Sequence, residues 1–509
     1  MQTDLVDGTR NLSILSESSS IPTTAAQIGN RLPPEVLAII FSHLSKQGPS
    51  PRYIRDLVSV THVCKFWRQA GINAPDLWAE IYVKNLEVVK VFLERSGVVP
   101  LSVDFHWGID QEEYYDLLEA VVPHAHRFLQ FSVHPPGGDP NPFAPFTKAA
   151  PLLKKLDITC PVELQQSFLF NDQAPLLREL VVYARNLWFQ NRFGNLTSLH
   201  LTLSDHIYSR SEFPPFFGVL RRCPALEEMF VWWITRDVAL ATASIQVPPI
   251  PLRHLRKVSL RSFCVENIRY LFHPFDFGEN EVALHLREVE FAHDEVPFVS
   301  IVQTVFANDN FRRLSLASLE LIFNTQSQTF ILHAVGPNSS IRIDMCLEVD
   351  AFYEFTFQDV FSSVKELWVR GTPDWDARLD GLEHLVALET LVLSGRGSRL
   401  AQNLQEALSS GSSGTLPCPL LSAIDCYGGE PEMREVFLLA RARFNAGYPL
   451  ERLRIPSSFV PPPVDVSPCV GDVTSLDPPA MPLNVHSMEL PEYCFAKDHE
   501  WWRTWGWRV

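Results

Sequence analysis

The 509-residue sequence lacks any run of eighteen apolar residues, the length that a membrane-spanning helix needs. Its first twenty residues are polar and include Asp4, where a secretory signal would carry basic residues. Nine cysteines are scattered without a CxxC pair, which is typical of reduced thiols and not of a disulfide framework. We therefore expect a protein of the cytoplasm and/or nucleus without membrane association.

Basic residues are also in short supply. The chain has 43 lysines and arginines against 59 aspartates and glutamates, giving a formal net charge of −16. A polyanionic partner would be repelled by such a chain as a whole. We expect no nonspecific binding to nucleic acid or to anionic membrane surfaces.

Catalytic motifs are missing as well. The sequence has no G-x-S-x-G, no P-loop, no G-x-G-x-x-G after a strand and no H-E-x-x-H. His124, His126 and His134 could be considered as metal ligands, but residues two apart on a helix face different ways and no carboxylate or cysteine completes the set. We expect no enzyme activity, no cofactor and no metal, and a stand-alone hydrolase is disfavoured.

What the chain does have begins at residues 31–78. Pro33 and Pro34 can open a helix, because its first N–H groups need no intrahelical partner, and Glu35 suits the helix dipole. An apolar face at helical spacing follows, then a glycine- and proline-containing break at 45–54 and a second apolar-periodic segment from Leu57 to Trp67. Three short helices bury little surface, so we expect a partner or a neighbouring domain to cover them.

This segment resembles the F-box, the helical module that docks on the Skp-type adaptor of cullin-RING ubiquitin ligases. The resemblance is carried by Leu32–Leu37, Ile40-Phe41 and Leu44, by Val63–Arg68, and by the closing Leu77-Trp78. It implies adaptor binding by Leu32, Pro33, Pro34, Leu37, Ile40, Phe41, Leu44, Val63, Cys64, Trp67, Leu77 and Trp78. The break after the first helix is longer than in the compact motif and resembles fungal F-box proteins. The alternative is a helical hairpin that caps the following domain.

Past this segment one pattern recurs, apolar-charged-charged-apolar-x-apolar. Composition alone predicts about two copies by chance. Eight are present, and they begin at Leu153, Leu177, Leu226, Leu255, Leu286, Phe311, Val364 and Leu450. The last two apolar residues of each copy are two apart, as on one side of a strand, and helix-like pieces lie between copies at 215–222 and 434–443.

These features predict an α/β fold, in which a short N-terminal helical F-box precedes an irregular leucine-rich-repeat-like solenoid with a parallel sheet on its concave face. Such divergent repeats resemble those common behind an F-box. A doubly wound α/β domain is the alternative, although it requires continuous apolar strands. The predicted divisions are a disordered segment at 1–29, the F-box at 30–83, the solenoid at 84–455, and a proline-rich linker with a Trp-rich cap at 456–509.

The resemblance implies the function of a substrate receptor in a Skp-cullin-F-box ubiquitin ligase, which would connect the adaptor and cullin-RING ligase to an unknown protein target. A non-catalytic scaffold that binds the adaptor without a cullin is the alternative. If the apolar repeat residues point inward, their neighbours project onto the concave face. Target binding is accordingly assigned to Tyr183, Phe230, Trp232, Arg261, Trp368 and Arg370. The four tryptophans at 501–507 would cap the last strand or bind a partner.

Overall fold

The computed structural model of the protein describes residues 32–43, 51–105, 109–136, 142–160, 168–184, 190–203, 213–233, 247–263, 268, 271–278, 282–289, 316–324, 329–336, 340–346, 354–357, 359–371, 378–395, 398–410, 417–460, 462 and 466–476. The predictions for the segment 1–29, for Leu44 and for the tryptophans at 501–507 lie outside these residues. Internal contacts divide the chain into two compact units, Met1–Asp104 and Phe105–Val509, each treated by itself below.

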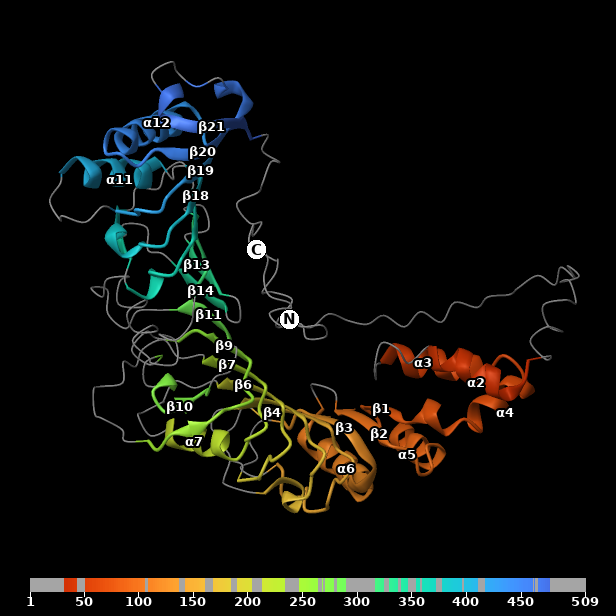
Figure 1. The fold of residues 1–509 in the computed structure, drawn as a ribbon. Coiled ribbons are helices and arrows are strands. Elements are labelled where there is room, and N and C mark those ends of the chain that lie inside the picture. Colours follow the sequence, from red (N-terminus) through yellow and green to blue (C-terminus); the bar gives the residue numbers. More distant parts are fainter. Residues whose placement is uncertain are drawn as a thin grey trace, which may run out of the picture. The chain divides into compact units, whose positions relative to one another are not determined.

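The first unit is mainly helical (Figure 1). Its elements are α2 (Pro34–Ser42), α3 (Pro51–Thr61), α4 (Lys65–Ile72), the 3₁₀ helix η2 (Pro75–Trp78), β1 (Glu80–Val83), α5 (Leu86–Arg95) and β2 (Leu101–Phe105), which ends at the unit boundary. Helix α4 packs against both α2 and α3, while α5 packs against η2 and β1. Thus α4 and η2 form the centre of this unit.

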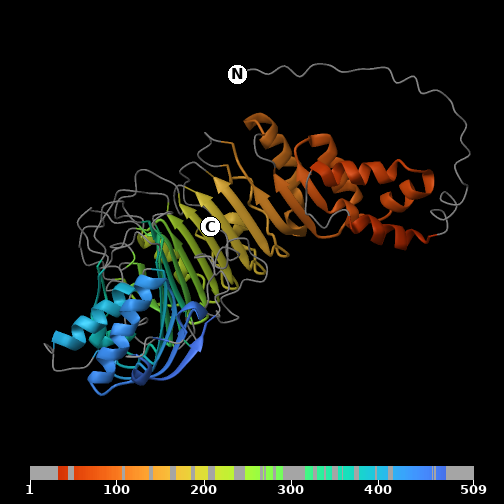
Figure 2. The ribbon, with the colours of Figure 1, turned by 90° about the horizontal axis from the view of Figure 1, so that it is seen from above.

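The second unit is built on one large sheet whose strands lie side by side (Figure 2). They are β3 (Phe128–Val133), β4 (Lys155–Cys160), β5 (Glu179–Ala184), β6 (Ser198–Leu203), β7 (Glu228–Trp233), β9 (Lys257–Arg261), β11 (Ala283–Val289), β12 (Ser318–Asn324), β13 (Thr329–Val335), β14 (Ser340–Cys346), β16 (Glu366–Gly371), β18 (Thr390–Gly395), β19 (Ala423–Tyr427), β20 (Leu450–Ile455) and β21 (Val470–Ser475). Together with the helices, this sheet confirms the α/β class.

Helices and short elements fill the connections between these strands. They are α6 (Gln111–Val121), η3 (Val122–Arg127), η4 (Leu169–Asp172), α7 (Phe213–Arg221), η5 (Asp359–Phe361), η6 (Leu382–His384), α11 (Ser398–Ser410), α12 (Glu430–Asn445), η7 (Ser457–Phe459) and η8 (Ser467–Cys469). Two small parallel pairs join β8 (Ile250–Pro251) to β10 (Phe275–Asp276) and β15 (Glu354–Thr356) to β17 (Arg378–Asp380). Helices α7, α11 and α12 lie on one side of the sheet (Figure 1), which we call the helix face.

The register of the sheet follows the predicted alternation. From β4 to β9 the parallel pairings align the apolar pairs that were predicted to point inward, for example Leu199 with Met229 and Leu201 with Val231. Those side chains are completely buried. Their neighbours along each strand point to the other side, which we call the opposite face.

Each of these strands is introduced by the same turn. The first residue of the turn accepts a hydrogen bond from the amide three residues later, as in Ala150–Leu153, and the middle positions often include proline. The equivalent bonds have lengths of 3.0 to 3.3 Å and join Ala150–Leu153, Ala174–Leu177, Phe193–Leu196, Cys223–Leu226, Leu252–Leu255, Phe361–Val364, Leu385–Leu388 and Cys418–Leu421. The buried leucine or valine of each turn anchors it in the interior, and this turn is the structural repeat of the unit.

The sheet is not uniformly parallel, although the repeats predicted a parallel sheet throughout. Strands β14, β13 and β12 stand in that order between β11 and β16, and β13 runs antiparallel to both of its neighbours. In chain order, β12 comes first and pairs with β16. Two hairpins then lead the chain back through β13 to β14, which pairs with β11. The pattern was missed because each strand has its own alternation and no charged pair precedes it, while most of the predicted copy at 311–316 lies outside the described residues.

Two further sequence predictions were wrong. In β11 the inward pair is Leu284 and Leu286, which align with Val258 and Leu260 of β9. The sequence pattern had made Leu286 the first apolar residue of its copy, before the strand, so this copy was assigned too far along the chain. The region 456–509 was predicted to begin with a proline-rich linker. Instead, β21 pairs in parallel with β20, because residues 470–475 contain no proline and are free to donate to a neighbouring strand.

Gly381 precedes η6 with a φ of 74°, and a Cβ atom placed there would lie 2.3 Å from the carbonyl oxygen of Phe357. We expect Gly381→Ala to lower the free energy of unfolding by about 2–4 kcal/mol, through backbone strain and steric overlap. Gly194→Ala is the matched control, since a Cβ atom at Gly194 meets nothing within 4 Å. Urea unfolding measures both variants, and equal stabilities would contradict this account of the turn.

Candidate functional site

Helix α2 has two apolar sides. Leu37 and Phe41 are buried, whereas Val36, Ile39 and Ile40 on the other side are 38%, 61% and 46% exposed. We call these last three residues the α2 stripe, since positions i, i+3 and i+4 share one side of a helix. The exposed Pro33 and Pro34 begin the helix, with Pro33 at the N-cap position.

The buried side of α2 is fixed by α4. The rings of Phe41 and Trp67 lie 5.3 Å apart between centroids. At Gly71, a Cβ atom would lie 3.9 Å from the Phe41 ring of α2 and 3.0 Å from Thr61 Cγ2 of α3. Cys64 caps α4, because its sulfur accepts a hydrogen bond from the Trp67 amide at 3.4 Å. These contacts leave α2 little freedom to turn its exposed stripe inward.

Trp78 closes the core of this unit. Its Nε1 donates to the Gly71 carbonyl oxygen at 2.9 Å, Phe92 packs edge-on at 5.0 Å, and the Arg95 guanidinium lies 4.3 Å from the ring centroid. Nearby, the hydroxyl of the buried Tyr53 donates to the Leu77 carbonyl oxygen. Burial, helped by the charge of Glu80, raises the pKa of Tyr53, so its proton stays in place.

The structure therefore separates the residues assigned to adaptor binding. Four of them, Leu37, Phe41, Leu77 and Trp78, are buried in the first unit and form its core. Leu32, Cys64 and Trp67 are half-buried, while Pro33, Pro34, Ile40 and Val63 are exposed. Sequence reasoning missed the exposed Val36, Ile39 and Val58. The 3.6-residue period of the helix was a usable signal for separating the two sides of α2.

The residues assigned to target binding lie on the opposite face of the sheet, in two groups. Tyr183, Trp232 and Arg261 share one row across β5, β7 and β9, with Thr202 between them on β6. The Arg261 guanidinium lies 4.1 Å from the Trp232 ring centroid, a cation–π contact. Trp368 and Arg370 on β16 are separated from this row by β11 and the meander.

Two of the assigned residues were expected to be exposed and are buried. Phe230 is covered in part by the His200 ring, stacked at 6.0 Å, and Arg370 is only 4% exposed. The Nε atom of Arg370 lies 3.2 Å from Glu320 Oε1. Their direction was predicted correctly, but alternation along a strand says nothing about what covers a face.

Charged groups of the meander meet on this opposite face. Asp344 accepts from Arg342 Nε at 2.7 Å and lies 3.1 Å from His285 Nε2. Glu320 Oε1 contacts Arg370 Nε, and Glu320 Oε2 lies 3.7 Å from His333 Nδ1. The side chains of Glu320 and His333 are completely buried, so this cluster is a structural polar core. Sequence reasoning missed it, although the alternating polar positions of 318–346 were a usable signal.

Burial and neighbouring charge shift the pKa values of this cluster. Burial alone would raise the pKa of Asp344, but Arg342 and His285 outweigh it and hold that pKa below its ordinary range. Burial lowers the pKa of His285 to about 4, although the Asp344 charge and hydrogen bond act against it. His285 is consequently neutral at physiological pH.

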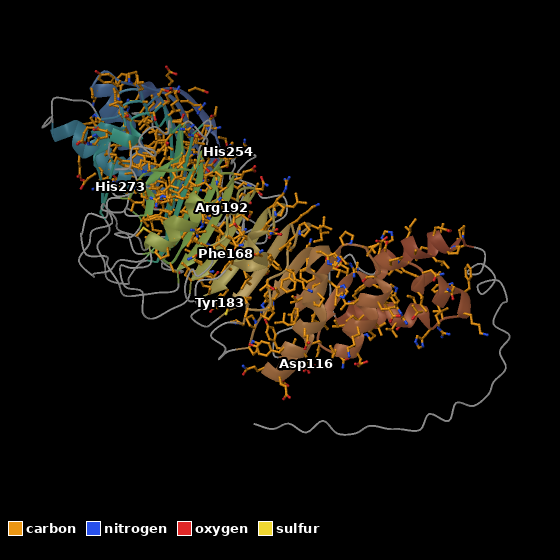
Figure 3. All side chains as sticks on the ribbon, turned by 90° about the horizontal axis from the view of Figure 1, so that it is seen from below. Asp116, Phe168, Tyr183, Arg192, His254 and His273 are labelled. Carbon is orange, nitrogen blue, oxygen red and sulfur yellow. The ribbon has the colours of Figure 1, made fainter. Side chains whose placement is uncertain are left out.

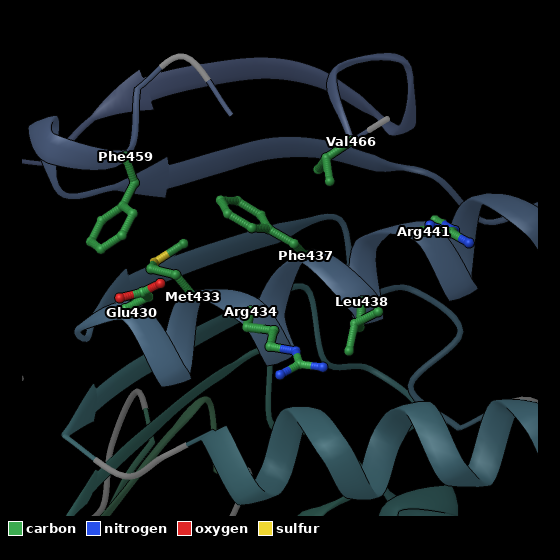
Figure 4. Close-up of a pocket in the computed structure, with 8 residues that line it drawn as sticks. All are labelled: Glu430, Met433, Arg434, Phe437, Leu438, Arg441, Phe459 and Val466. Carbon is green, nitrogen blue, oxygen red and sulfur yellow. The ribbon is translucent and has the colours of Figure 1, made fainter. Parts of the chain in front are cut away.

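A pocket of about 390 Å³ opens on α12 (Figure 4). Met433, Phe437 and Leu438 form its apolar part, Glu430, Arg434 and Arg441 its charged part, and Phe459 and Val466 its remaining wall. None of these residues was assigned a role from the sequence. Their mixture of one carboxylate and two guanidinium groups around apolar side chains holds no catalytic arrangement.

The histidines that were considered as metal ligands make other contacts in the structure. His124 and His126 belong to η3, their ring centroids are 6.5 Å apart, and Arg127 Nη1 lies 3.4 Å from His124 Nδ1. Burial lowers the pKa of His124, and the charges of Arg127, His126 and Lys148 lower it further. Within the described ranges no group of three His, Cys, Asp or Glu residues is placed to hold a metal ion.

Comparison with known proteins bears on the first unit. The structure defines an α/β protein with a mainly helical N-terminal unit, in which α2 carries an exposed apolar stripe. Residues 30–84 match the family model described as F-box-like, which confirms the F-box prediction for this segment. This chain therefore contains an F-box-like domain, and because F-box domains bind Skp-type adaptors, an adaptor of this type is supported as its partner.

The same comparison does not extend to the rest of the chain. No curated protein matches the chain. Among the helices in the described part of the chain, none combines the length and the apolar character needed to span a membrane.

His285 should make the stability of the protein depend on pH. Its folded pKa of about 4 lies below the ordinary 6.5, so the unfolded chain takes up more protons between these values. Stability is thus complete above pH 6.5 and falls by about 2 kcal/mol by pH 5 from this group alone. We expect His285→Gln to remove this part of the pH dependence in urea unfolding.

The control is His254→Gln, since His254 is exposed and should leave the pH profile unchanged. A His285→Gln profile as steep as that of the parent would show that burial of the ring does not hold it neutral.

Proposed function

We propose that the protein is the substrate-receptor subunit of a Skp-cullin-F-box ubiquitin ligase. The observation that carries the proposal is the α2 stripe, an apolar surface on a helix whose other side is already buried. Fully burying a valine or isoleucine side chain contributes roughly 1.5–3 kcal/mol, so these three residues could supply several kcal/mol to adaptor binding. The second unit would then hold the protein target.

In this role the protein performs no chemistry of its own. It places target lysines near the ubiquitin-conjugating enzyme and so raises their effective concentration, which is a sufficient catalytic contribution. The absence of a catalytic motif from the sequence is in keeping with that role, and such a ligase would work in the cytoplasm and/or nucleus.

The α2 stripe is tested by the double substitution Ile39→Asp/Ile40→Asp. Each aspartate would bring a charge into an apolar interface, so we expect adaptor affinity to fall about a hundredfold or more. Isothermal titration with purified Skp-type adaptor measures the change. Because both residues are exposed, the circular dichroism spectrum and unfolding midpoint should remain those of the parent.

Val98→Asp is the matched control, since Val98 belongs to the same unit and is 91% exposed outside α2. It should bind the adaptor with parental affinity. Adaptor binding that survives Ile39→Asp/Ile40→Asp would exclude the α2 stripe as the docking surface.

Reconstitution separates a receptor from a scaffold. The protein, the adaptor and a cullin-RING subunit are mixed and passed over a size-exclusion column, and a receptor should elute with both partners. Elution with the adaptor while the cullin stays separate would favour the scaffold.

A further inference from the structure

The second unit contains a basic region inside an acidic chain. Residues 142–263 hold 14 lysines and arginines against 9 aspartates and glutamates, whereas the whole chain has a net charge of −16. Four of these cations lie at the ends of the strands where the repeated turns lie. Lys148, Lys154, Arg178 and Arg192 are all exposed there.

The repeated turns place these cations in register. The Arg178 amide donates to the Lys154 carbonyl oxygen at 2.9 Å, and the Thr197 amide donates to the Arg178 carbonyl oxygen at 2.9 Å. Lys154, Arg178 and Thr197 are therefore successive rungs, separated by the strand spacing of about 4.8 Å. Lys148 adds positive charge beside η3, where its field contributes to the lowered pKa of His124.

Apolar side chains stand beside the cations at equivalent turn positions. Leu152 and Leu176 follow the exposed prolines of two adjacent turns and are 38% and 43% exposed. Each comes two residues before a cation, Lys154 and Arg178 respectively. We call the set Lys148, Leu152, Lys154, Leu176, Arg178 and Arg192 the basic edge.

Side-chain hydrogen bonds hold this edge rigid. Asn195 Nδ2 donates to the Pro175 carbonyl oxygen at 2.8 Å, and the Arg192 amide donates to Asp172 Oδ1 at 2.7 Å. The buried Asn191 bonds both the amide and the carbonyl oxygen of Leu169, at 2.9 and 2.7 Å. A preorganised surface loses little entropy when a partner binds.

The carboxylates near these cations offset only part of their charge, since residues 142–263 keep an excess of lysine and arginine. Asp172 receives the Arg192 amide, and Glu179 forms an ion pair with Lys155 at 2.6 Å. Figure 3 labels Arg192 and His254 among the side chains of this unit. Asp172 keeps its negative charge, because a backbone amide is neutral, and Glu227 is exposed at the rung after Thr197, so these carboxylates reduce the positive field of the basic edge without cancelling it.

From this arrangement we propose that the basic edge binds an acidic segment of a protein partner that carries apolar side chains between its carboxylates. This inference rests on the proposed function, because it gives the location and chemical class of target recognition. The carboxylates would pair with Lys154 and Arg178, and the intervening apolar groups would cover Leu152 and Leu176.

The basic edge suits this partner better than the opposite face does. On that face Glu320, His333, His285 and Arg370 are buried, Arg370 pairs with Glu320 and His285 with Asp344, so these groups offer little accessible surface. Nucleic acid is disfavoured, because leucines interrupt the cations and the total charge of the chain repels a long polyanion.

Fluorescence anisotropy of the full-length chain tests the proposal with a fluorescein-labelled peptide of alternating glutamate and leucine. The probe should bind, and Lys154→Glu/Arg178→Glu should weaken it about tenfold, because attraction becomes repulsion at two contacts. Leu176→Ser should weaken it about threefold through lost apolar burial.

The matched control is Lys365→Glu/Arg441→Glu, which makes the same change of charge on exposed side chains elsewhere in the unit. It should bind the probe within twofold of the parent. Absence of probe binding, or an equal loss in this control, would overturn the proposal.

Two further probes identify the partner class. A peptide of equal charge with serine in place of leucine should bind more weakly, and an oligothymidylate of equal charge more weakly still. Equal binding of the serine peptide, or tighter binding of the oligonucleotide, would also overturn the proposal. Adaptor binding is measured separately, so none of these failures would count against the α2 stripe.

Discussion

A short helix that is apolar on two sides cannot bury both sides within a unit of about a hundred residues, and α2 is such a helix. Leu37 and Phe41 fill the interior against α4, and this fixes Val36, Ile39 and Ile40 on the outside. Rotation of α2 would remove Leu37 and Phe41 from this interior and separate the Phe41 and Trp67 rings, so it would be costly. The exposed stripe is therefore a consequence of the core, and the function assigned to this unit depends on it.

The same rule of alternation organises the second unit at a larger scale. Each repeat supplies two inward apolar side chains from its strand and one buried anchor from the preceding turn. These side chains pack against the equivalent ones of the next repeat and so keep adjacent strands in register. Because apolar side chains of the core occupy those positions, the polar and charged side chains of the repeats lie on the opposite face and at the exposed turn positions. The opposite face contains the buried polar core around Glu320 and Asp344, and the exposed turn positions carry the cations of the basic edge.

Sequence reasoning reached the elements whose signal is local. The F-box segment and the inward pairs of β4 to β9 depend on spacing within a few residues, and they were predicted correctly. The meander and its charged cluster were missed because they depend on pairing between distant strands, which propensity does not encode. Burial of Phe230 and Arg370 was missed for a related reason, since a side chain's direction does not reveal what lies over it. Leu286 shows the third cause, a motif match displaced from the true strand.

The central claim is that the α2 stripe is the docking surface, and hydroxyl-radical footprinting in the presence of a Skp-type adaptor tests it most directly. Side-chain oxidation of Ile39 and Ile40 is compared with and without adaptor, with the highly exposed Val98 as an internal reference. The account predicts that Ile39 and Ile40 lose reactivity on complex formation while Val98 keeps it. A complex that forms while both isoleucines remain as reactive as in the free protein would contradict it.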